Sequence, residues 1–391
     1  MRYNNSFLII LFISSILGIL IGIYNNNLID SQENYNVNEN LNKLKTNTKE
    51  KQKQKIEEEK EEKEKEKEKE KEKQEQNEQK DREEKEEIKD NYIDEVFYNN
   101  KLRIAISYST DNKYIYPTIV AITSLVENAG NNTFYDIYIT HTPDFNEYSK
   151  YFLKTVEKKY PNKCKIIYFN MGNKYKGLKL NFRLATSAYY RLSLHELLPN
   201  VKRIIYMDGD TLVFEDLTEL IKLDMKGNII MGFLDVSIDA IKSFGFENAT
   251  VLCSGVLLMD LEALRKYDYS KKINDFITNY KNKLDQHDQT IINVVFQGKI
   301  APLPPKYGMW AWMDEIAAKH HLDVQRPWLK YNETEYFYAV YHPAILHYIW
   351  PKPFWKRKTA FYEEWWDYAK KTGFYDDIYK KSPVPNIKWR L

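Results

Sequence analysis

The sequence predicts an α/β fold: a Rossmann-like, mostly parallel sheet with helices on both faces. Two observations predict it. Apolar strands and amphipathic helices alternate through residues 102–208, and such alternation is typical of parallel sheets covered on both sides. In addition, a pair of acidic residues directly follows one of these strands, and α/β folds bind their ligands beyond the carboxyl ends of the strands.

The predicted elements follow one another with short connections. The first strand, 102–109, precedes a helix at 116–130 whose apolar residues recur near helical spacing. Two further helices end at Pro161 and Pro199, because proline cannot continue a helix. The remaining strands are predicted at 134–142, 163–171 and 202–208, and the remaining helices at 146–161 and 182–199.

An uncharged, almost wholly apolar stretch lies near the amino terminus, at residues 7–24. A helix of this length spans about 27 Å, close to the hydrocarbon thickness of a bilayer. A cleaved signal peptide is the alternative, but its apolar run is usually about 7–15 residues, and a small-residue cleavage site should follow. We therefore expect a short tail at 1–6 and an uncleaved transmembrane signal anchor at 7–24.

Residues 25–100 are Asn-rich and then Lys/Glu-rich. Ile56 is the only large aliphatic residue between Lys51 and Glu87, which excludes a coiled-coil seam. We interpret this low-complexity segment as a solvated stem that holds a globular domain, residues 101–391, away from a membrane.

The orientation follows from the charges that flank the apolar stretch. Arg2 precedes it, and acidic residues follow it, so the positive-inside rule predicts a single-pass type II membrane protein. In a eukaryote the domain would face the Golgi lumen. The alternative is a bacterial inner membrane, with the domain facing the cytosol.

The composition and the missing motifs exclude several classes of protein. The formal net charge is +2, which gives no argument for nucleic-acid binding. Two cysteines, Cys164 and Cys253, are too few for a disulfide-built scaffold, and the sequence leaves their pairing open. The sequence contains no G-x-G-x-x-G after the first strand, no P-loop, no G-x-S-x-G and no H-E-x-x-H.

The stretch RIIYMDGDTLVF, residues 203–214, places Asp208 and Asp210 at the end of a predicted buried strand. Two carboxylates separated by Gly209 can converge on one hard divalent cation, because glycine allows a tight turn. Oxygen ligands suit Mg²⁺ or Mn²⁺, and an added imidazole favours Mn²⁺. The alternative is an ordinary turn in which an aspartate caps the next segment.

Five blocks in the same order resemble glycosyltransferase family 8, and together they span residues 102–355. The central block is YYRLSLHELLPNVKRIIYMDGDTLVFEDLTEL, and the others are STDNKY (109–114), CSGVLLMDLEALR (253–265), HDQTIINVVFQGKIAPLP (287–304) and HYIWPKPF (347–354). The resemblance implies the GT-A fold of nucleotide-diphospho-sugar transferases, with helices on both faces of the sheet.

The resemblance also implies a metal centre and a donor site. Asp208, Asp210 and His347 would bind Mn²⁺, with Mg²⁺ as the alternative ion, and the diphosphate of a UDP-sugar would complete the coordination. The fallback for the third ligand is His342. Among the residues that bind the donor, Lys352 would contact the diphosphate.

The remaining implied contacts reach the uracil and the sugar. Asp111 and the backbone near Ser109 would receive the uracil. Arg191, Asp288 and Gln289 would line the donor sugar, with Gln289 near the anomeric carbon. Family members retain the anomeric configuration.

The sequence departs from the family pattern at several positions. Cys253 stands where the family usually has an asparagine beside the donor sugar. In the last block, Trp350 replaces a glycine, one residue fewer separates His347 from Lys352, and Phe354 replaces the final tryptophan.

The resemblance implies a hexosyltransferase that moves glucose or galactose from a UDP-sugar to a glycan or glycoconjugate acceptor. The alternative is a non-catalytic, membrane-tethered protein that keeps the fold and binds a glycan or another partner.

Overall fold

The computed structural model describes residues 97–98, 101–178, 186–235, 239–247, 249–311, 331–349, 352–356 and 358–382. All of them belong to one compact unit, Tyr92–Leu391. The predicted anchor at 7–24 and nearly all of the predicted stem lie outside the described residues. Among the helices of the described ranges, none has both the length and the apolar character needed to cross a membrane.

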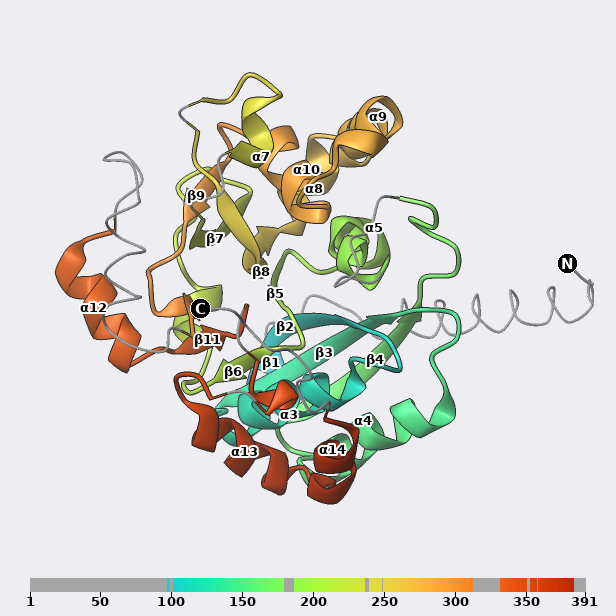
Figure 1. Cartoon of the computed structure of the whole chain (residues 1–391), viewed down its shortest axis with the longest axis vertical. Coiled ribbons are helices and arrows are strands. Elements are labelled where there is room, and N and C mark those ends of the chain that lie inside the picture. Colours follow the sequence, from blue (N-terminus) through green and yellow to red (C-terminus); the bar gives the residue numbers. More distant parts are fainter. Residues whose placement is uncertain are drawn as a thin grey trace, which may run out of the picture. The chain divides into compact units, whose positions relative to one another are not determined.

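An eight-stranded sheet forms the main layer, with seven strands in the order β4-β3-β2-β5-β8-β7-β9 and β1 paired with β2 (Figure 1). Its strands are β1 (Phe97–Tyr98), β2 (Lys101–Thr110), β3 (Thr133–His141), β4 (Cys164–Asn170), β5 (Arg203–Met207), β7 (Ile230–Leu234), β8 (Leu252–Asp260) and β9 (Ile300–Pro302). The pairs among β2, β3, β4 and β5 are parallel, as is β7 with β9. The α/β prediction is therefore confirmed, but β8 runs antiparallel to both β5 and β7, which the alternation pattern did not indicate.

The four predicted strands correspond to β2, β3, β4 and β5, and two of the predicted helices to α3 (Ile115–Glu127) and α4 (Glu147–Lys159). Helix α4 begins where the side chain of Asn146 accepts a hydrogen bond from the amide of Ser149, at 2.9 Å. Such a cap satisfies a backbone N–H that has no partner within the helix.

The helix predicted at 182–199 differs from the observed structure. Its described part is a 3₁₀ helix, η1 (Thr186–Ser193), followed by a single α-turn, α5 (Leu194–Leu197). Five consecutive residues of η1, from Tyr189 to Ser193, are buried, so this segment has no solvated face. Its conformation is therefore set by contacts on all sides, and tertiary context overrides the helical pattern.

A second sheet, which the sequence did not predict, has three strands in the order β10-β11-β6. They are β6 (Thr211–Val213), β10 (Tyr307–Trp310) and β11 (Ile345–His347). Strand β11 pairs antiparallel with β6, with His347 opposite Thr211. Because β6 directly follows the Asp-Gly-Asp turn, this ladder carries the carboxyl-terminal part of the chain to that turn.

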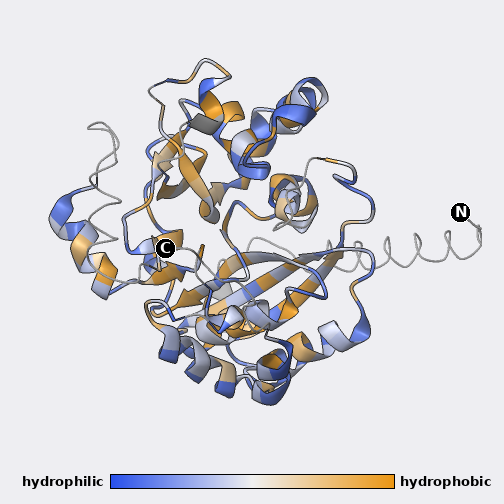
Figure 2. Cartoon of the chain, in the orientation of Figure 1, coloured by the Kyte–Doolittle hydropathy of each residue, from blue (hydrophilic) through white to orange (hydrophobic). Residues whose placement is uncertain are grey.

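Figure 1 shows helices on both sides of the main sheet, with α3, α4, α13 and α14 on one side and α5, α8, α9 and α10 on the other. Figure 2 shows apolar residues concentrated in the strands and polar residues on the outer helices. The remaining helices are α6 (Thr218–Ile221), α7 (Asp239–Lys242), α8 (Leu261–Lys266), α9 (Tyr269–Tyr280), η2 (Lys281–Lys283), α10 (Asp288–Val295), α12 (Glu333–Tyr341), η4 (Pro353–Trp355), α13 (Tyr362–Lys371) and α14 (Tyr375–Lys381).

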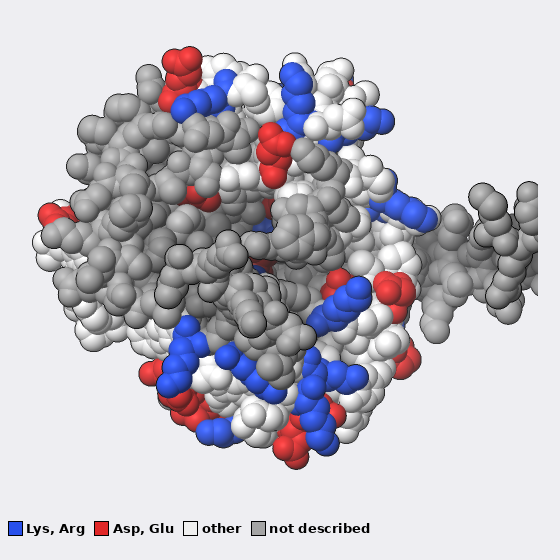
Figure 3. Space-filling view, in the orientation of Figure 1, with Lys and Arg blue, Asp and Glu red and all other residues white. Residues whose placement is uncertain are grey.

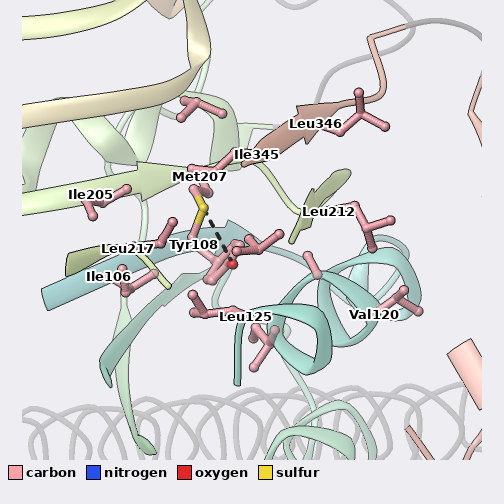
Figure 4. Packing of buried hydrophobic residues seen from close by; sticks show 14 of the residues in the cluster. Ile106, Tyr108, Val120, Leu125, Ile205, Met207, Leu212, Leu217, Ile345 and Leu346 are labelled. Carbon is pink, nitrogen blue, oxygen red and sulfur yellow. Dashed lines mark hydrogen bonds between the residues drawn. The ribbon is translucent and has the colours of Figure 1, made fainter. Parts of the chain in front are cut away.

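One hydrophobic core contains buried residues of both sheets (Figure 4). Tyr108 of β2 is fully buried there, and its hydroxyl donates a weak hydrogen bond to the sulfur of Met207, at 3.9 Å. Side chains from α3, β6 and β11, including Leu125, Leu212 and Ile345, belong to the same cluster. The strand that precedes the acidic turn is therefore fixed by tight packing.

Two observations on charge and cysteine complete the fold. On the face shown in Figure 3, basic and acidic side chains lie interspersed around the rim.

Cys164 and Cys253, whose pairing the sequence left open, are both free and buried.

Candidate functional site

The Asp-Gly-Asp turn connects β5 of the main sheet to β6 of the second sheet. The amide of Asp208 donates to the carbonyl of Gly255 at 2.7 Å, and the amide of Thr211 donates back to the carbonyl of Asp208 at 3.2 Å. A Cβ at Gly209 would lie 2.3 Å from Oγ1 and 3.3 Å from Cα of Thr118 on α3. Only glycine fits here, because the backbone of the turn lies directly against the helix.

The two carboxylates meet an imidazole from β11. Asp208, Asp210 and His347 each offer one ligand atom, and these atoms all lie within 4.8 Å of one another. Nε2 of His347 is 3.3 Å from Oδ1 of Asp210 and 3.7 Å from Oδ2 of Asp208. The amide of Tyr348 donates to the carbonyl of Asp210 at 3.0 Å, so the backbone itself holds the histidine next to the turn.

Positive charge and a tyrosine hydroxyl contact the other oxygen of Asp210. The ammonium of Lys352 pairs with Oδ2, and the hydroxyl of Tyr114 donates to the same atom at 2.5 Å. Burial opposes ionisation of Asp210, but Lys352 and His347 outweigh it and hold the pKa of this carboxyl well below its ordinary value. The pKa of Tyr114 is raised, mainly by burial and then by the nearby charge of Asp210.

The same electrostatics act on the histidine. Burial alone would lower its pKa, but Asp210 and Cys253 raise the pKa of His347 to about 10. The electrostatic environment beside Asp208 and Asp210 therefore strongly favours a positively charged group.

The three residues fit a divalent cation. Oδ1 of Asp210 is buried and receives no hydrogen bond of regular geometry, although Nε2 of His347 lies 3.3 Å away, and a buried oxygen normally requires a partner. It faces Nε2 of His347, and two carboxylates with one imidazole form the mixed oxygen and nitrogen set that suits Mn²⁺ better than Mg²⁺. The group therefore has the ligand types, the spacing and the unsatisfied oxygen that a metal centre requires.

Arg191 of η1 links this centre to α10. Its guanidinium donates to Oδ1 of Asp208 at 2.8 Å and to the carbonyl of Ser254, and its Nε lies 3.1 Å from Oδ2 of Asp288. It also stacks 4.1 Å from the ring centroid of Tyr206, whose hydroxyl donates to the same oxygen of Asp208 at 2.9 Å. Only 3% of the Arg191 side chain is exposed, so its charge acts in a weakly screened environment.

Asp288 and Gln289 begin helix α10 beside Arg191. Burial raises the pKa of Asp288 to about 6, with Arg191 opposing the shift and Asp208 adding to it. Gln289 is held by three hydrogen bonds: its Oε1 accepts from the amide of Ser254 at 3.0 Å, and its Nε2 donates to Asp235 at 2.9 Å and to Gln286 at 3.0 Å. Its side chain is therefore fixed in one orientation.

A bulge in β8 supplies several of these contacts. Neighbouring residues of β7, Gly232 and Phe233, pair with Leu257 and Cys253, so residues 254–256 of β8 have no partners in β7. At a bulge, backbone groups leave the regular hydrogen bonds between the strands and point in a different direction. Here it turns the backbone of residues 254 and 255 towards Gln289, Arg191 and Asp208.

Gly255 lies directly under the imidazole. A Cβ at this position would come within 2.1 Å of Cε1, 2.6 Å of Nδ1 and 2.7 Å of Nε2 of His347. Sγ of Cys253 also contacts the ring, 3.7 Å from Nδ1. The predicted contact of Cys253 with a donor sugar remains a prediction, whereas its contact with the histidine is observed.

The predicted uracil site is organised by local hydrogen bonds. Asp111 accepts from the amides of Lys113 and Tyr114, each at 2.8 Å, and this turn begins helix α3. The hydroxyl of Ser109 lies 2.8 Å from that of Thr140. The hydroxyl of Tyr114 connects this loop to Asp210. The predicted uracil site and the acidic pair are therefore in contact through Tyr114, a residue that the sequence did not indicate.

One predicted alternative ligand lies away from the site, and two residues of the site were not predicted. The fallback ligand His342 is exposed at the end of α12 and contacts Tyr338, with ring centroids 4.7 Å apart, rather than the acidic pair. Tyr206 and Asp235, which contact Asp208 and Gln289, were not predicted as site residues. The proximity of Tyr206 to Asp208 could have been inferred, because Tyr206 lies two residues before it at the end of the same strand.

Comparisons with known proteins identify the family and the fold of the chain. A sequence profile described as Glycosyl transferase family 8 matches residues 105–359, more than half of the chain. The lipopolysaccharide 1,2-glucosyltransferase of Escherichia coli is 26% identical over 267 residues, which cover 61% of this chain and 77% of that protein. General stress protein A of Bacillus subtilis is 25% identical over 193 residues, which cover 48% of this chain and 65% of that protein.

Solved structures share the fold. The galactosyltransferase LgtC, crystallised with donor and acceptor sugar analogues, aligns with a TM-score of 0.55 at 21% identity, over 72% of this chain and 98% of LgtC. The bifunctional glycosyltransferase WbbM aligns with a TM-score of 0.57 at 18% identity, over 73% of this chain and 52% of WbbM, so this chain spans about half of that protein. At such identities the likeness establishes the fold alone.

Replacing Gly255 by alanine tests the geometry of the centre. Because the new Cβ would overlap the imidazole, His347 must leave its place beside the carboxylates. We expect Gly255→Ala to weaken Mn²⁺ binding at least about tenfold, measured by calorimetric titration, with an unchanged circular dichroism spectrum.

Gly172→Ala is the control, because a Cβ there meets nothing within 4 Å, although φ is +54°. Its left-handed backbone costs about 1–2 kcal/mol, and its Mn²⁺ affinity should equal that of the wild type. Wild-type affinity in a folded Gly255→Ala protein would contradict the assigned position of His347.

Proposed function

The chain belongs to glycosyl transferase family 8, and on this premise we propose that it transfers a hexose from a UDP-sugar to a glycan or glycoconjugate acceptor. The observation that carries the proposal is the convergence of Asp208, Asp210 and His347 at the end of β5. This is where α/β folds bind their ligands. Glucose or galactose is the proposed sugar, and the name of the Escherichia coli relative, a glucosyltransferase, supports a hexose.

We propose that the three residues hold Mn²⁺, which, when bound, would neutralise negative charge on the diphosphate leaving group. The ammonium of Lys352 pairs with Asp210. It can therefore add a second positive charge to the diphosphate, a role suited to a compact cation. Electrostatic stabilisation of this type is usually a large part of enzymatic rate enhancement.

We propose separate roles for Arg191 and Gln289. The guanidinium of Arg191 already binds the carbonyl of Ser254 and two carboxylates, so its role is to orient Asp208 and Asp288. Gln289 is half-buried and rigidly held, and we assign it the position beside the sugar. A preorganised polar side chain stabilises developing charge without having to reorient during the reaction.

Transfer breaks the bond between the anomeric carbon and the phosphate oxygen, and the electron pair leaves with UDP. The acceptor oxygen forms the new bond from the same face, and its proton passes to the departing diphosphate. This course retains the anomeric configuration without a carboxylate placed as a nucleophile on the opposite face.

The acidic pair is tested by Asp208→Asn and Asp210→Asn in the full-length protein. Each change removes a charge that a cation requires, and we expect kcat for UDP release to fall at least about 100-fold. The assay uses UDP-glucose and UDP-galactose with Mn²⁺. EDTA should stop the wild-type reaction, and added Mn²⁺ should restore it.

Asp376→Asn, which alters an exposed residue of α14, is the matched control and should keep wild-type turnover. Near-normal turnover of either active-site variant, or activity that persists in EDTA, would contradict the metal-dependent mechanism. A wild-type protein that releases no UDP from any sugar nucleotide would instead favour the non-catalytic alternative.

The stereochemistry provides a separate test. UDP-glucose and UDP-galactose carry an α-linked sugar, so a retaining transfer yields an α-glycoside. We expect proton NMR of the first product to show the small anomeric coupling of an α-linkage. A β-linked first product would contradict attack from the leaving-group face and would require a general base opposite it.

We also propose that residues 7–24 anchor the enzyme in a membrane and that the charged segment after them acts as a spacer. Most of this part of the chain lies outside the described residues, so the proposal rests on the sequence alone. Intact protein should sediment with membranes and resist carbonate extraction, whereas a variant with four lysines inserted in 7–24 should not. Extraction of the wild type by carbonate would contradict an integral anchor.

A further inference from the structure

We propose that Cys253 is a positioning residue for His347: its thiol accepts a hydrogen bond from Nδ1 and thereby keeps Nε2 directed at the carboxylates. The inference rests on the metal centre of the proposed function. It gives this cysteine a role distinct from contact with the donor sugar.

The contact is close and enclosed. Sγ of Cys253 lies 3.7 Å from Nδ1 of His347, which is hydrogen-bonding distance for sulfur, and the two residues are 6% and 5% exposed. Water therefore competes little for either group. A polar N–H enclosed in this way needs a partner, because leaving a buried donor unsatisfied is unfavourable.

The contacts of Nε2 determine which atom donates in the hydrogen bond between Nδ1 and the thiol. Nε2 faces Oδ1 of Asp210 at 3.3 Å and Oδ2 of Asp208 at 3.7 Å. A nitrogen that ligates a metal must offer its lone pair, so the proton of a neutral imidazole must reside on Nδ1. The sulfur of Cys253 is then the acceptor, in the way that partners beyond the ligands fix the tautomer of metal-bound histidines.

The backbone and the carboxylates hold the ring in place, and Cys253 adds a third contact that depends on the orientation of the ring. The backbone of His347 is held in β11 between β10 and β6, and the missing Cβ of Gly255 leaves room for the imidazole. Rotation by 180° about χ2 keeps the same outline but exchanges nitrogen with carbon. The flipped ring would present carbon both to the carboxylates and to the thiol, so the contact with Cys253 adds to the contacts of Nε2 in disfavouring the flip.

The thiol does not ligate the same ion. Nδ1 and Nε2 diverge from the ring, and Sγ lies on the Nδ1 side, whereas the carboxylates lie on the Nε2 side. In the described part of the chain, the group able to hold a metal consists of Asp208, Asp210 and His347 without the cysteine. Its effect must therefore pass through the imidazole.

Three substitutions separate hydrogen bonding from shape. Cys253→Ala removes the acceptor, Cys253→Val removes it but fills the space, and Cys253→Ser keeps a small acceptor. We expect the alanine and valine variants to bind Mn²⁺ about 10- to 100-fold more weakly, since loss of a partner beyond the ligands has this effect. The serine variant should remain within about threefold of wild type, as judged by EPR titration of free Mn²⁺.

Cys164→Ala is the matched control. This residue is the other buried free cysteine, on β4, and its sulfur contacts the carbonyl of Tyr160 at 3.9 Å rather than any residue of the site. The variant should bind Mn²⁺ as the wild type does. Circular dichroism of all four variants checks that they fold.

A second readout needs no metal. In the protein labelled with ¹⁵N-histidine, the Nδ1 proton of His347 should exchange slowly with water in the wild type and rapidly in Cys253→Ala. Absence of Mn²⁺ binding by the wild type, with this proton still protected, would overturn the metal centre but keep the thiol contact. Wild-type Mn²⁺ affinity in both Cys253→Ala and Cys253→Val, or equal weakening in Cys253→Ser, would overturn the positioning role.

Discussion

The antiparallel ladder between β6 and β11 is the contact on which the whole site depends. It places His347 opposite Thr211, and the hydrogen bond from Tyr348 to Asp210 extends the ladder into the acidic turn. Backbone hydrogen bonds thus join a histidine near the carboxyl terminus to aspartates in the middle of the chain. A metal centre needs ligands held within a few tenths of an ångström, and regular backbone pairing holds them better than a loop does.

The second requirement is that several carboxylates stay charged in a poorly solvated place. Asp208 and Asp288 share the guanidinium of Arg191, and Asp210 has Lys352 and a histidine beside it. Each of these three carboxylates therefore has a cationic partner, without which the burial of Asp210 and Asp288 would be very unfavourable. Burial raises the pKa of Asp288 to about 6, so the charged form of Asp288 is less stabilised than that of Asp210, whose pKa is lowered.

The bulge in β8 connects these two arrangements. One short stretch of backbone accepts from Arg191 and Asp208 and donates to Gln289, and the glycine within it leaves room for the imidazole. Cys253 stands at the start of the same bulge. The histidine, the arginine and the glutamine are consequently positioned by a single irregularity in one strand.

Local sequence patterns predicted much of this structure. Alternating apolar runs identified β2, β3, β4 and β5, and the acidic pair after β5 identified the centre of the site. The antiparallel course of β8, the second sheet and the 3₁₀ form of η1 depend on long-range pairing and on burial from all sides, which periodicity does not report. For the same reason Tyr114 was overlooked: it reaches Asp210 across 96 residues of sequence, and nothing in its neighbours indicates that contact.

Pulsed EPR of Mn²⁺ bound to the full-length protein tests the central claim most directly, because it detects the nuclei around the ion. The structure predicts modulation from one imidazole nitrogen, which should vanish in His347→Gln and persist in His342→Gln. Addition of UDP should then introduce coupling to ³¹P. Bound Mn²⁺ without nitrogen modulation, or modulation that survives in His347→Gln, would contradict a cation held by the acidic turn and the histidine of β11.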